Sequence, residues 1–82
     1  METKILKIDE ISRTRLLRAF RKLGFVEDFH TKDVTVLRQM NFPFDRLVIP
    51  NDREISVELI KLYLKDLNLD WNDFYTNFLL TS

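Results

Sequence analysis

The chain has 82 residues, 45% of them hydrophobic, and this length predicts a single domain whose core extends over about residues 12–80. Thirteen basic and thirteen acidic residues leave no net charge, which argues against a strongly basic nucleic-acid binder. The absence of cysteine excludes disulfides and thiolate chemistry, and with His30 as the single histidine we expect no metal and no cofactor.

Charge is unevenly distributed along the chain. Residues 1–23 hold seven basic and three acidic side chains, whereas residues 51–82 hold three basic and six acidic ones. A basic front and an acidic back suit contact with a polyanion, or two copies that meet head to tail. No run of apolar residues is long enough for a signal-peptide core or a membrane helix, so we expect a cytoplasmic protein that does not bind membranes.

The first predicted helix spans residues 13–23, with Ser12 as its N-cap and Gly24 as its stop. At about 100° per residue, its apolar side chains form one stripe that we expect to face the core. The opposite side is entirely positive and consists of Arg15, Arg18, Arg21 and Lys22. Arginine pairs with phosphate in a bidentate manner, so these four residues are the predicted RNA-binding surface. The alternative is a face that contacts only water.

Three strands and two more helices follow. Residues 25–30 and 33–39 alternate β-branched or aromatic residues with polar ones, and residues 46–49 form a third strand that ends at Pro50. Their short connections predict an antiparallel meander. Helices are predicted over residues 57–67, capped by Ser56, and over about residues 71–80. The fold class is thus α+β: a helix, a three-stranded antiparallel sheet and two helices. We expect Phe20, Leu23, Val36, Ile49, Leu59 and Leu64 to be buried.

Two groups of aromatic residues are candidates for a partner interface. Phe42 and Phe44 flank a proline in a predicted loop, where they can stack on bases, seat a partner or fold over the open end of the core. Trp71, Phe74 and Phe78 form a stripe on the last helix, which is either core or the interface of a homo-oligomer or another partner. We expect no catalytic residue, unless His30 acts as a general acid or base near neutral pH.

Several segments together resemble a known family. Gly24-Phe25-Val26 is similar to a glycine–aromatic entry into a sheet, and Arg46-Leu47-Val48-Ile49-Pro50 followed by Glu54-Ile55 is similar to the end of a third strand and its polar turn. Leu59, Leu64 and residues 71–74 are similar to a Leu-rich helix and a terminal hydrophobic one. In this order, over about residues 12–80, the segments resemble the HicA family of bacterial toxin–antitoxin ribonucleases, whose fold is similar to the double-stranded-RNA-binding domain.

The chain departs from this family at the catalytic position. The family's histidine follows a Gly-Ser/Asp-like pair on the second strand, and the matching positions here are Lys32, Asp33 and Val34. His30 lies four residues earlier, about 13 Å away if both residues belonged to one strand with a rise of roughly 3.3 Å per residue. Either the hairpin here differs in length from that of the family, which would shift the matching positions, or the nuclease chemistry is lost, and we favour the loss.

We accordingly expect a HicA-like module that binds RNA or an antitoxin-like protein and has a degenerate nuclease site. Two alternatives stay open. One is an active, divergent mRNA-cleaving toxin of a type II toxin–antitoxin system that uses His30. The other is a protein–protein interaction module that binds through its acidic C-terminal helices and their aromatic stripe.

Overall fold

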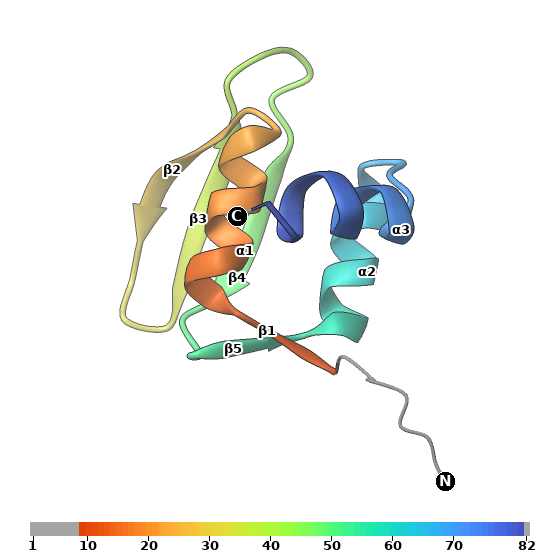
Figure 1. Ribbon diagram of the computed structural model, residues 1–82. Helices are drawn as coiled ribbons and strands as arrows, with labels where there is room; N and C mark the ends of the chain where they lie inside the picture. Colours follow the sequence, from red (N-terminus) through yellow and green to blue (C-terminus); the bar gives the residue numbers. More distant parts are fainter. Residues whose placement is uncertain (1–8, 82) are drawn as a thin grey trace, which may run out of the picture.

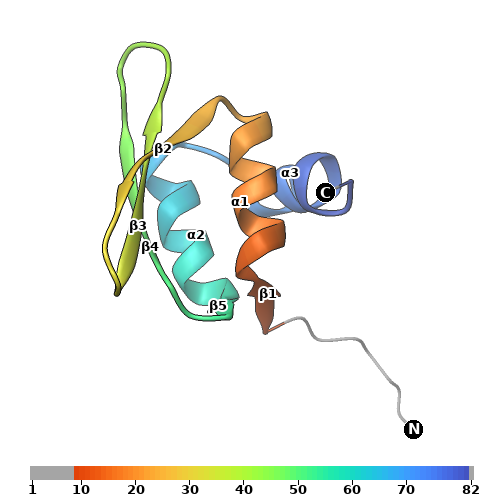
Figure 2. The same cartoon turned by 90° about the vertical axis from the view of Figure 1, so that its left-hand side faces the viewer.

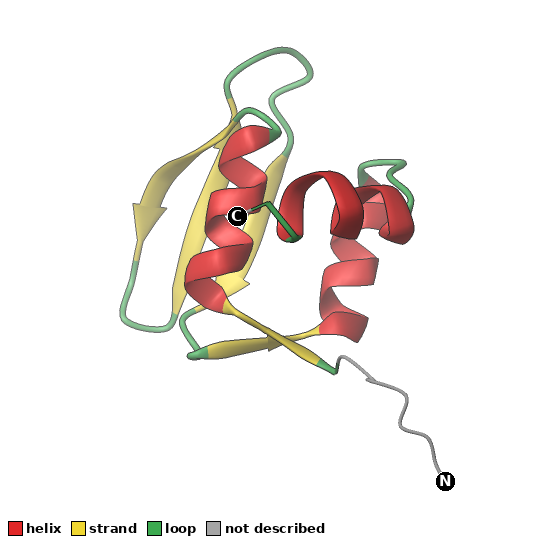
Figure 3. Cartoon of the chain, in the orientation of Figure 1, coloured by secondary structure: helices red, strands yellow, loops and turns green. Residues whose placement is uncertain are grey.

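A three-stranded antiparallel sheet carries helices on one of its faces (Figures 1 and 3). This computed structural model describes residues 9–81, and it confirms the α+β class and the antiparallel meander. In chain order the elements are β1 (Glu10–Ser12), α1 (Arg13–Lys22), β2 (Phe25–His30), β3 (Val34–Gln39), β4 (Arg46–Pro50), β5 (Glu54–Ser56), α2 (Val57–Asp66), α3 (Trp71–Phe74) and the π-helical η1 (Tyr75–Leu79).

Helix α1 begins and ends where its capping residues predict. The side chain of Ser12 accepts a hydrogen bond from the Arg15 N–H at 3.2 Å, which satisfies one of the free donors of the first turn. At the other end Gly24 has a φ of 98°, and its N–H donates to the Arg21 carbonyl. A residue with a Cβ is strained at this φ, so glycine fixes the direct passage from helix into β2.

The core lies between the sheet and its helices, which Figure 2 shows together on one side of β2, β3 and β4. Phe20 of α1 occupies its centre, with ring centroids 5.6 Å from Phe25, 6.3 Å from Tyr63 and 5.3 Å from Phe74. The buried residues that pack into this cluster are Ile11, Leu16, Ala19, Phe20, Phe25, Leu37, Leu47, Ile49, Ile55, Val57, Ile60, Tyr63, Leu64, Phe74 and Leu79.

Two of the six predicted core residues differ from expectation. Leu23 and Leu59 are only partly buried at the edge of the core. Val36 is buried as predicted, on the face of the sheet opposite the helices, because its neighbours Thr35 and Leu37 face the helices and side chains alternate along a strand. Its cross-strand partners on that open face, Phe29 and Val48, are exposed. Phe20, Ile49 and Leu64 are confirmed as core.

A second, two-stranded sheet was not predicted from the sequence. β1 pairs with β5 in antiparallel register, with Ile11 opposite Ile55, and both isoleucines are buried. Residue 54, expected in a polar turn, therefore belongs to a strand. Strands of three residues are too short to show a period, which explains the omission. In Figure 1 this small sheet lies beneath the first turns of α1 and α2, and the Arg13 N–H donates to the Arg53 carbonyl.

The last predicted helix is a short α-helix continued by a π-helix. Asp70 caps α3, since its carboxylate accepts from the Asp73 N–H at 3.2 Å. Beyond it the Leu80 N–H donates to the Tyr75 carbonyl five residues earlier, the bond of a π turn. This segment packs against α1 and buries Phe74 and Leu79 there.

Candidate functional site

A polar hollow of about 320 Å³ opens where α1 begins and where β2 turns into β3. It is lined by Arg13 from α1, Glu27 and His30 from β2, Thr35 from β3, and Asn51, which follows β4. Every one of these side chains donates or accepts hydrogen bonds, and two of them carry opposite full charges. The hollow therefore suits a polar or charged ligand rather than an apolar one.

A β-bulge brings Glu27 and His30 to the same face of the sheet. Glu27 lies opposite Leu37 and His30 lies opposite Thr35, so three steps on β2 match two steps on β3. Residues three apart on a regular strand point to opposite faces, and the extra residue of a bulge cancels this alternation. The bulge is thus the feature that lets the two side chains meet above the helix-covered face.

His30 and Glu27 form a hydrogen-bonded pair. The Nδ1 atom of His30 lies 2.8 Å from Oε2 of Glu27, and both side chains remain accessible to solvent. An ionised carboxylate only accepts, so Nδ1 carries the proton and the neutral ring keeps its lone pair on Nε2. This is the arrangement in which a carboxylate orients an imidazole for proton transfer through its other nitrogen.

Arg13 is held in place by a small network of side chains. Its Nη2 donates to Oγ1 of Thr35 and, at 3.0 Å, to Oδ1 of Asn51. The Thr35 hydroxyl, in a residue only 1% exposed, donates to the same Asn51 oxygen at 2.7 Å. Asn51 in turn donates from Nδ2 to the Thr31 carbonyl at 2.8 Å. The guanidinium group is therefore fixed by neutral partners.

The charge of Arg13 is not neutralised by a carboxylate. Within residues 9–81 Arg13 forms no ion pair, and its buried Nε has no hydrogen-bond partner. A guanidinium group with free donors and no counter-ion attracts carboxylate or phosphate oxygens, which it binds through charge-assisted hydrogen bonds. Arg13 also starts α1, where the helix dipole favours an anion.

The predicted basic surface of α1 is narrower than expected. Arg15 is half-buried and donates from Nε to the Leu79 carbonyl at 2.9 Å, and Lys22 donates from Nζ to the Thr81 carbonyl at 2.8 Å. Basic side chains satisfy the free carbonyls at a helix C-terminus, which explains why these two turn toward η1. Arg18 and Arg21 remain exposed.

The five aromatic candidates separate into two groups. Phe42 is 85% exposed and packs edge-on against the exposed Phe44, with ring centroids 6.0 Å apart, in the loop that protrudes beyond the sheet in Figure 3. Trp71 and Phe78 are half-buried against the core. Phe74 is 1% exposed and belongs to the core, so it presents no surface to a partner. Its ring packs against Phe20 of α1, whereas Trp71 lies beside Lys61 of α2.

The hairpin corrects the distance expected between His30 and Val34. The estimate of about 13 Å assumed one continuous strand, but the chain reverses between them, with the Thr31 N–H donating to the Val34 carbonyl at 2.8 Å. His30 lies opposite Thr35, the neighbour of Val34, and paired residues of antiparallel strands have Cα atoms roughly 5 Å apart. His30 therefore lies beside Val34 at the same end of the hairpin.

Four residues of the hollow were missed from the sequence. Arg13 was counted as the first residue of a helix, and Glu27, Thr35 and Asn51 as ordinary strand or turn residues. One signal was available: a threonine in a strand position that otherwise holds core residues needs a polar partner. Which residue supplies that partner depends on tertiary structure.

The chain was compared with known proteins and structures. No protein-family model, no curated protein and no solved structure matches it. In the range 9–81 no helix has the length and apolar character needed to cross a bilayer. The same range contains no group of three acidic or histidine side chains placed to hold a metal ion. The function must therefore be argued from the geometry of the hollow.

Proposed function

We propose that the chain is a HicA-like module that binds RNA and seats one backbone phosphate in the polar hollow. The observation that carries this proposal is the guanidinium group of Arg13, which Thr35 and Asn51 hold and which has no carboxylate counter-ion among residues 9–81. A phosphate supplies the missing negative charge, and the first turn of α1 adds its dipole.

The exposed part of α1 extends this binding surface. Arg18 and Arg21 lie on the helix beyond the hollow, which leaves room for further phosphates along its length of about 15 Å. We leave Arg15 and Lys22 out of the proposed surface because both donate to the C-terminal segment, although Lys22 is exposed. An RNA backbone that follows α1 thus meets three basic residues rather than four.

Binding of a fluorescently labelled structured RNA at increasing salt tests this proposal. Replacing Arg13 with Gln, or both Arg18 and Arg21 with Gln, should weaken binding and lower the log–log salt slope by roughly 0.7–0.9 per lost contact. Lys65→Gln is the matched control, because this lysine is exposed at the end of α2, away from the hollow. Absence of binding by the wild type at about 50 mM salt would instead favour the protein–protein interaction module.

RNA cleavage is the second candidate function, and the pair of His30 and Glu27 favours it. His30 Nε2 would take the proton of a ribose 2′-hydroxyl, whose oxygen then forms a bond to the adjacent phosphorus. The bond from phosphorus to the 5′-oxygen breaks, and that oxygen receives a proton from the imidazolium. Arg13 would stabilise the added negative charge. The products are a 2′,3′-cyclic phosphate and a 5′-hydroxyl, and no metal takes part in this scheme.

A cleavage assay separates the two candidates. Cleavage that persists in EDTA, disappears in His30→Ala and falls in Glu27→Gln would establish the enzyme. The control is Glu58→Gln, which removes an exposed carboxylate from α2. Binding without cleavage would instead establish the module with a degenerate nuclease site.

A further inference from the structure

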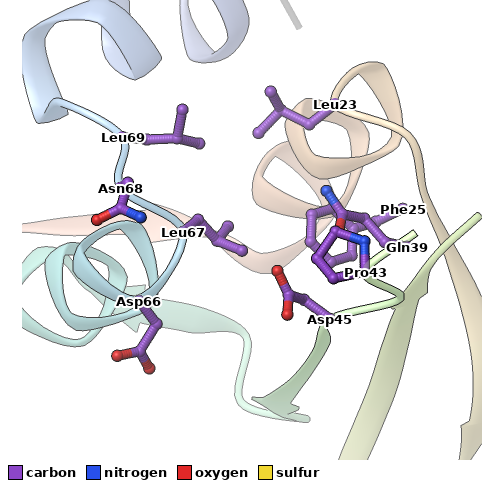
Figure 4. A pocket seen from close by; sticks show the side chains of 9 residues that line it. All are labelled: Leu23, Phe25, Gln39, Pro43, Asp45, Asp66, Leu67, Asn68 and Leu69. Carbon is purple, nitrogen blue, oxygen red and sulfur yellow. The ribbon is translucent and has the colours of Figure 1, made fainter. Parts of the chain in front are cut away.

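A second pocket, of about 310 Å³, lies at the opposite end of α1 (Figure 4). It lies where the ends of α1 and α2, the start of β2 and the β3–β4 loop meet. Most of its wall is apolar and is formed by Leu23, Phe25, Pro43, Leu67 and Leu69. Its remaining lining residues are Gln39, Asp45, Asp66 and Asn68.

Three side-chain acceptors of this pocket, on Gln39, Asp45 and Asp66, have no partner among the described residues. In Figure 4 the Asp45 carboxylate points into the pocket toward Leu67, whereas the Asp66 carboxylate points away from the other lining side chains. Neither carboxylate forms an ion pair within residues 9–81. The buried Oε1 of Gln39 also lacks a hydrogen-bond partner among these residues. A buried acceptor without a donor costs about 1–3 kcal/mol, so a ligand that brings donors is favoured.

We propose that this pocket binds an arginine side chain of a protein partner. The three methylenes of arginine match the leucine and proline walls, and its guanidinium group brings five donors for Asp45 and Gln39. Arginine suits the pocket better than lysine, because it pairs with a carboxylate through two parallel bonds and is more weakly hydrated.

The loop beside the pocket supplies the rest of the docking surface. Pro43 lines the pocket, and its neighbours Phe42 and Phe44 expose their rings to solvent. Aromatic rings contact both a cationic side chain and the apolar residues that flank it. A partner segment with arginine beside apolar residues would therefore engage the pocket and the loop together.

This proposal is independent of RNA binding, since the pocket and the hollow lie at opposite ends of α1. The test is titration of the full chain with N-acetyl-arginine methylamide, followed by backbone amide NMR shifts. We expect saturable shifts centred on Gln39 and residues 67–69. N-acetyl-citrulline methylamide, which has the same shape without the charge, should bind about tenfold more weakly or worse.

Two variants locate the site. Asp45→Asn should weaken arginine binding about tenfold, whereas Asp52→Asn, which removes an exposed carboxylate far from the pocket, should leave it unchanged. Equal binding of arginine and citrulline, or shifts centred on another face, would overturn the proposal. Self-association of the wild type that Asp45→Asn abolishes, measured by analytical ultracentrifugation, would also overturn it and make a second copy the occupant.

Discussion

The polar side chains near the two ends of α1 differ in how far they hydrogen-bond to one another. At its start, Arg13, Thr35 and Asn51 bond to one another in a continuous network, in which the buried Nε of Arg13 alone lacks a partner among the described residues. At its end, Gln39, Asp45 and Asp66 border apolar walls without partners of their own among the described residues. The first arrangement contributes to stability and holds a charge in place. The second leaves stabilisation to be gained when a ligand binds.

We expect the largest loss of stability from a change that weakens the packing of α1 on the core, because both ends of the helix depend on that packing. Phe20→Ala removes the ring that contacts Phe25, Tyr63 and Phe74, and we expect the free energy of unfolding to fall by about 3–5 kcal/mol. Urea unfolding measures this loss. Phe29→Ala, on the open face of the sheet, should cost less than about 1 kcal/mol. Similar losses in the two variants would contradict the assigned core.

Removing the Thr35 hydroxyl tests the hydrogen-bonded network that holds Arg13 at the start of α1. Thr35→Val preserves the shape of a residue that is almost fully buried but leaves Arg13 and Asn51 short of a partner. We expect a loss of about 1–3 kcal/mol in thermal or urea unfolding and weaker RNA binding. Thr14→Val, at an exposed position of α1, is the control and should change little. An unchanged stability of Thr35→Val would mean that the network does not stabilise the hollow.

A pH titration tests the packing of α2 against the sheet, which Tyr63 joins to β4. Burial raises the pKa of Tyr63 to about 12, and its hydroxyl donates to the Val48 carbonyl at 2.6 Å. Since the usual pKa is about 10, the unfolded chain loses this proton first. Stability should therefore be fully present below pH 10 and decrease as the pH rises toward 12. Tyr63→Phe should remove this part of the pH dependence, which alkaline denaturation followed by circular dichroism measures.

We expect the smallest change in stability from Gln39, which lies beside the C-terminal end of α1. Gln39→Leu removes the buried amide oxygen that lacks a partner, so stability should stay unchanged or rise by up to about 1 kcal/mol. The comparison with Thr35→Val is direct, because both changes replace a polar side chain by an apolar one near the ends of the same strand, β3. A loss of more than about 1 kcal/mol would show that Gln39 is satisfied in solution, and the contrast between the two ends would then disappear.

The sequence predicts most of the fold because its signals are local. Ser12, Ser56 and Asp70 each cap a helix as expected, and the change of period after Gly24 correctly marks the start of the sheet. The two strands of the small sheet escape prediction because three residues define no period. Val36 is buried as predicted, but on the open face of the sheet, and which face a buried strand residue occupies depends on tertiary pairing.

The candidate site could be predicted only in fragments. His30 was identified from its residue type alone, but its relation to Glu27 depends on one extra residue in β2, which no composition reveals. The basic side chains of α1 were correctly expected to lie away from the core, since Arg18, Arg21 and Lys22 are exposed. Its two residues that bind Leu79 and Thr81 could not be separated from the others, because those contacts join residues at opposite ends of the chain.

These long-range contacts also determine when the domain can form during synthesis. Helix α1 is made early, yet β5 supports its first turn and Leu79 and Thr81 bind its basic side chains. Contacts between residues about 60 positions apart slow folding, because the loop between them must close first. The native packing of α1 therefore waits until residues 79–81 have left the ribosome. A chain stalled before residue 79 would expose the apolar stripe of α1, which makes it a substrate for chaperones and proteases.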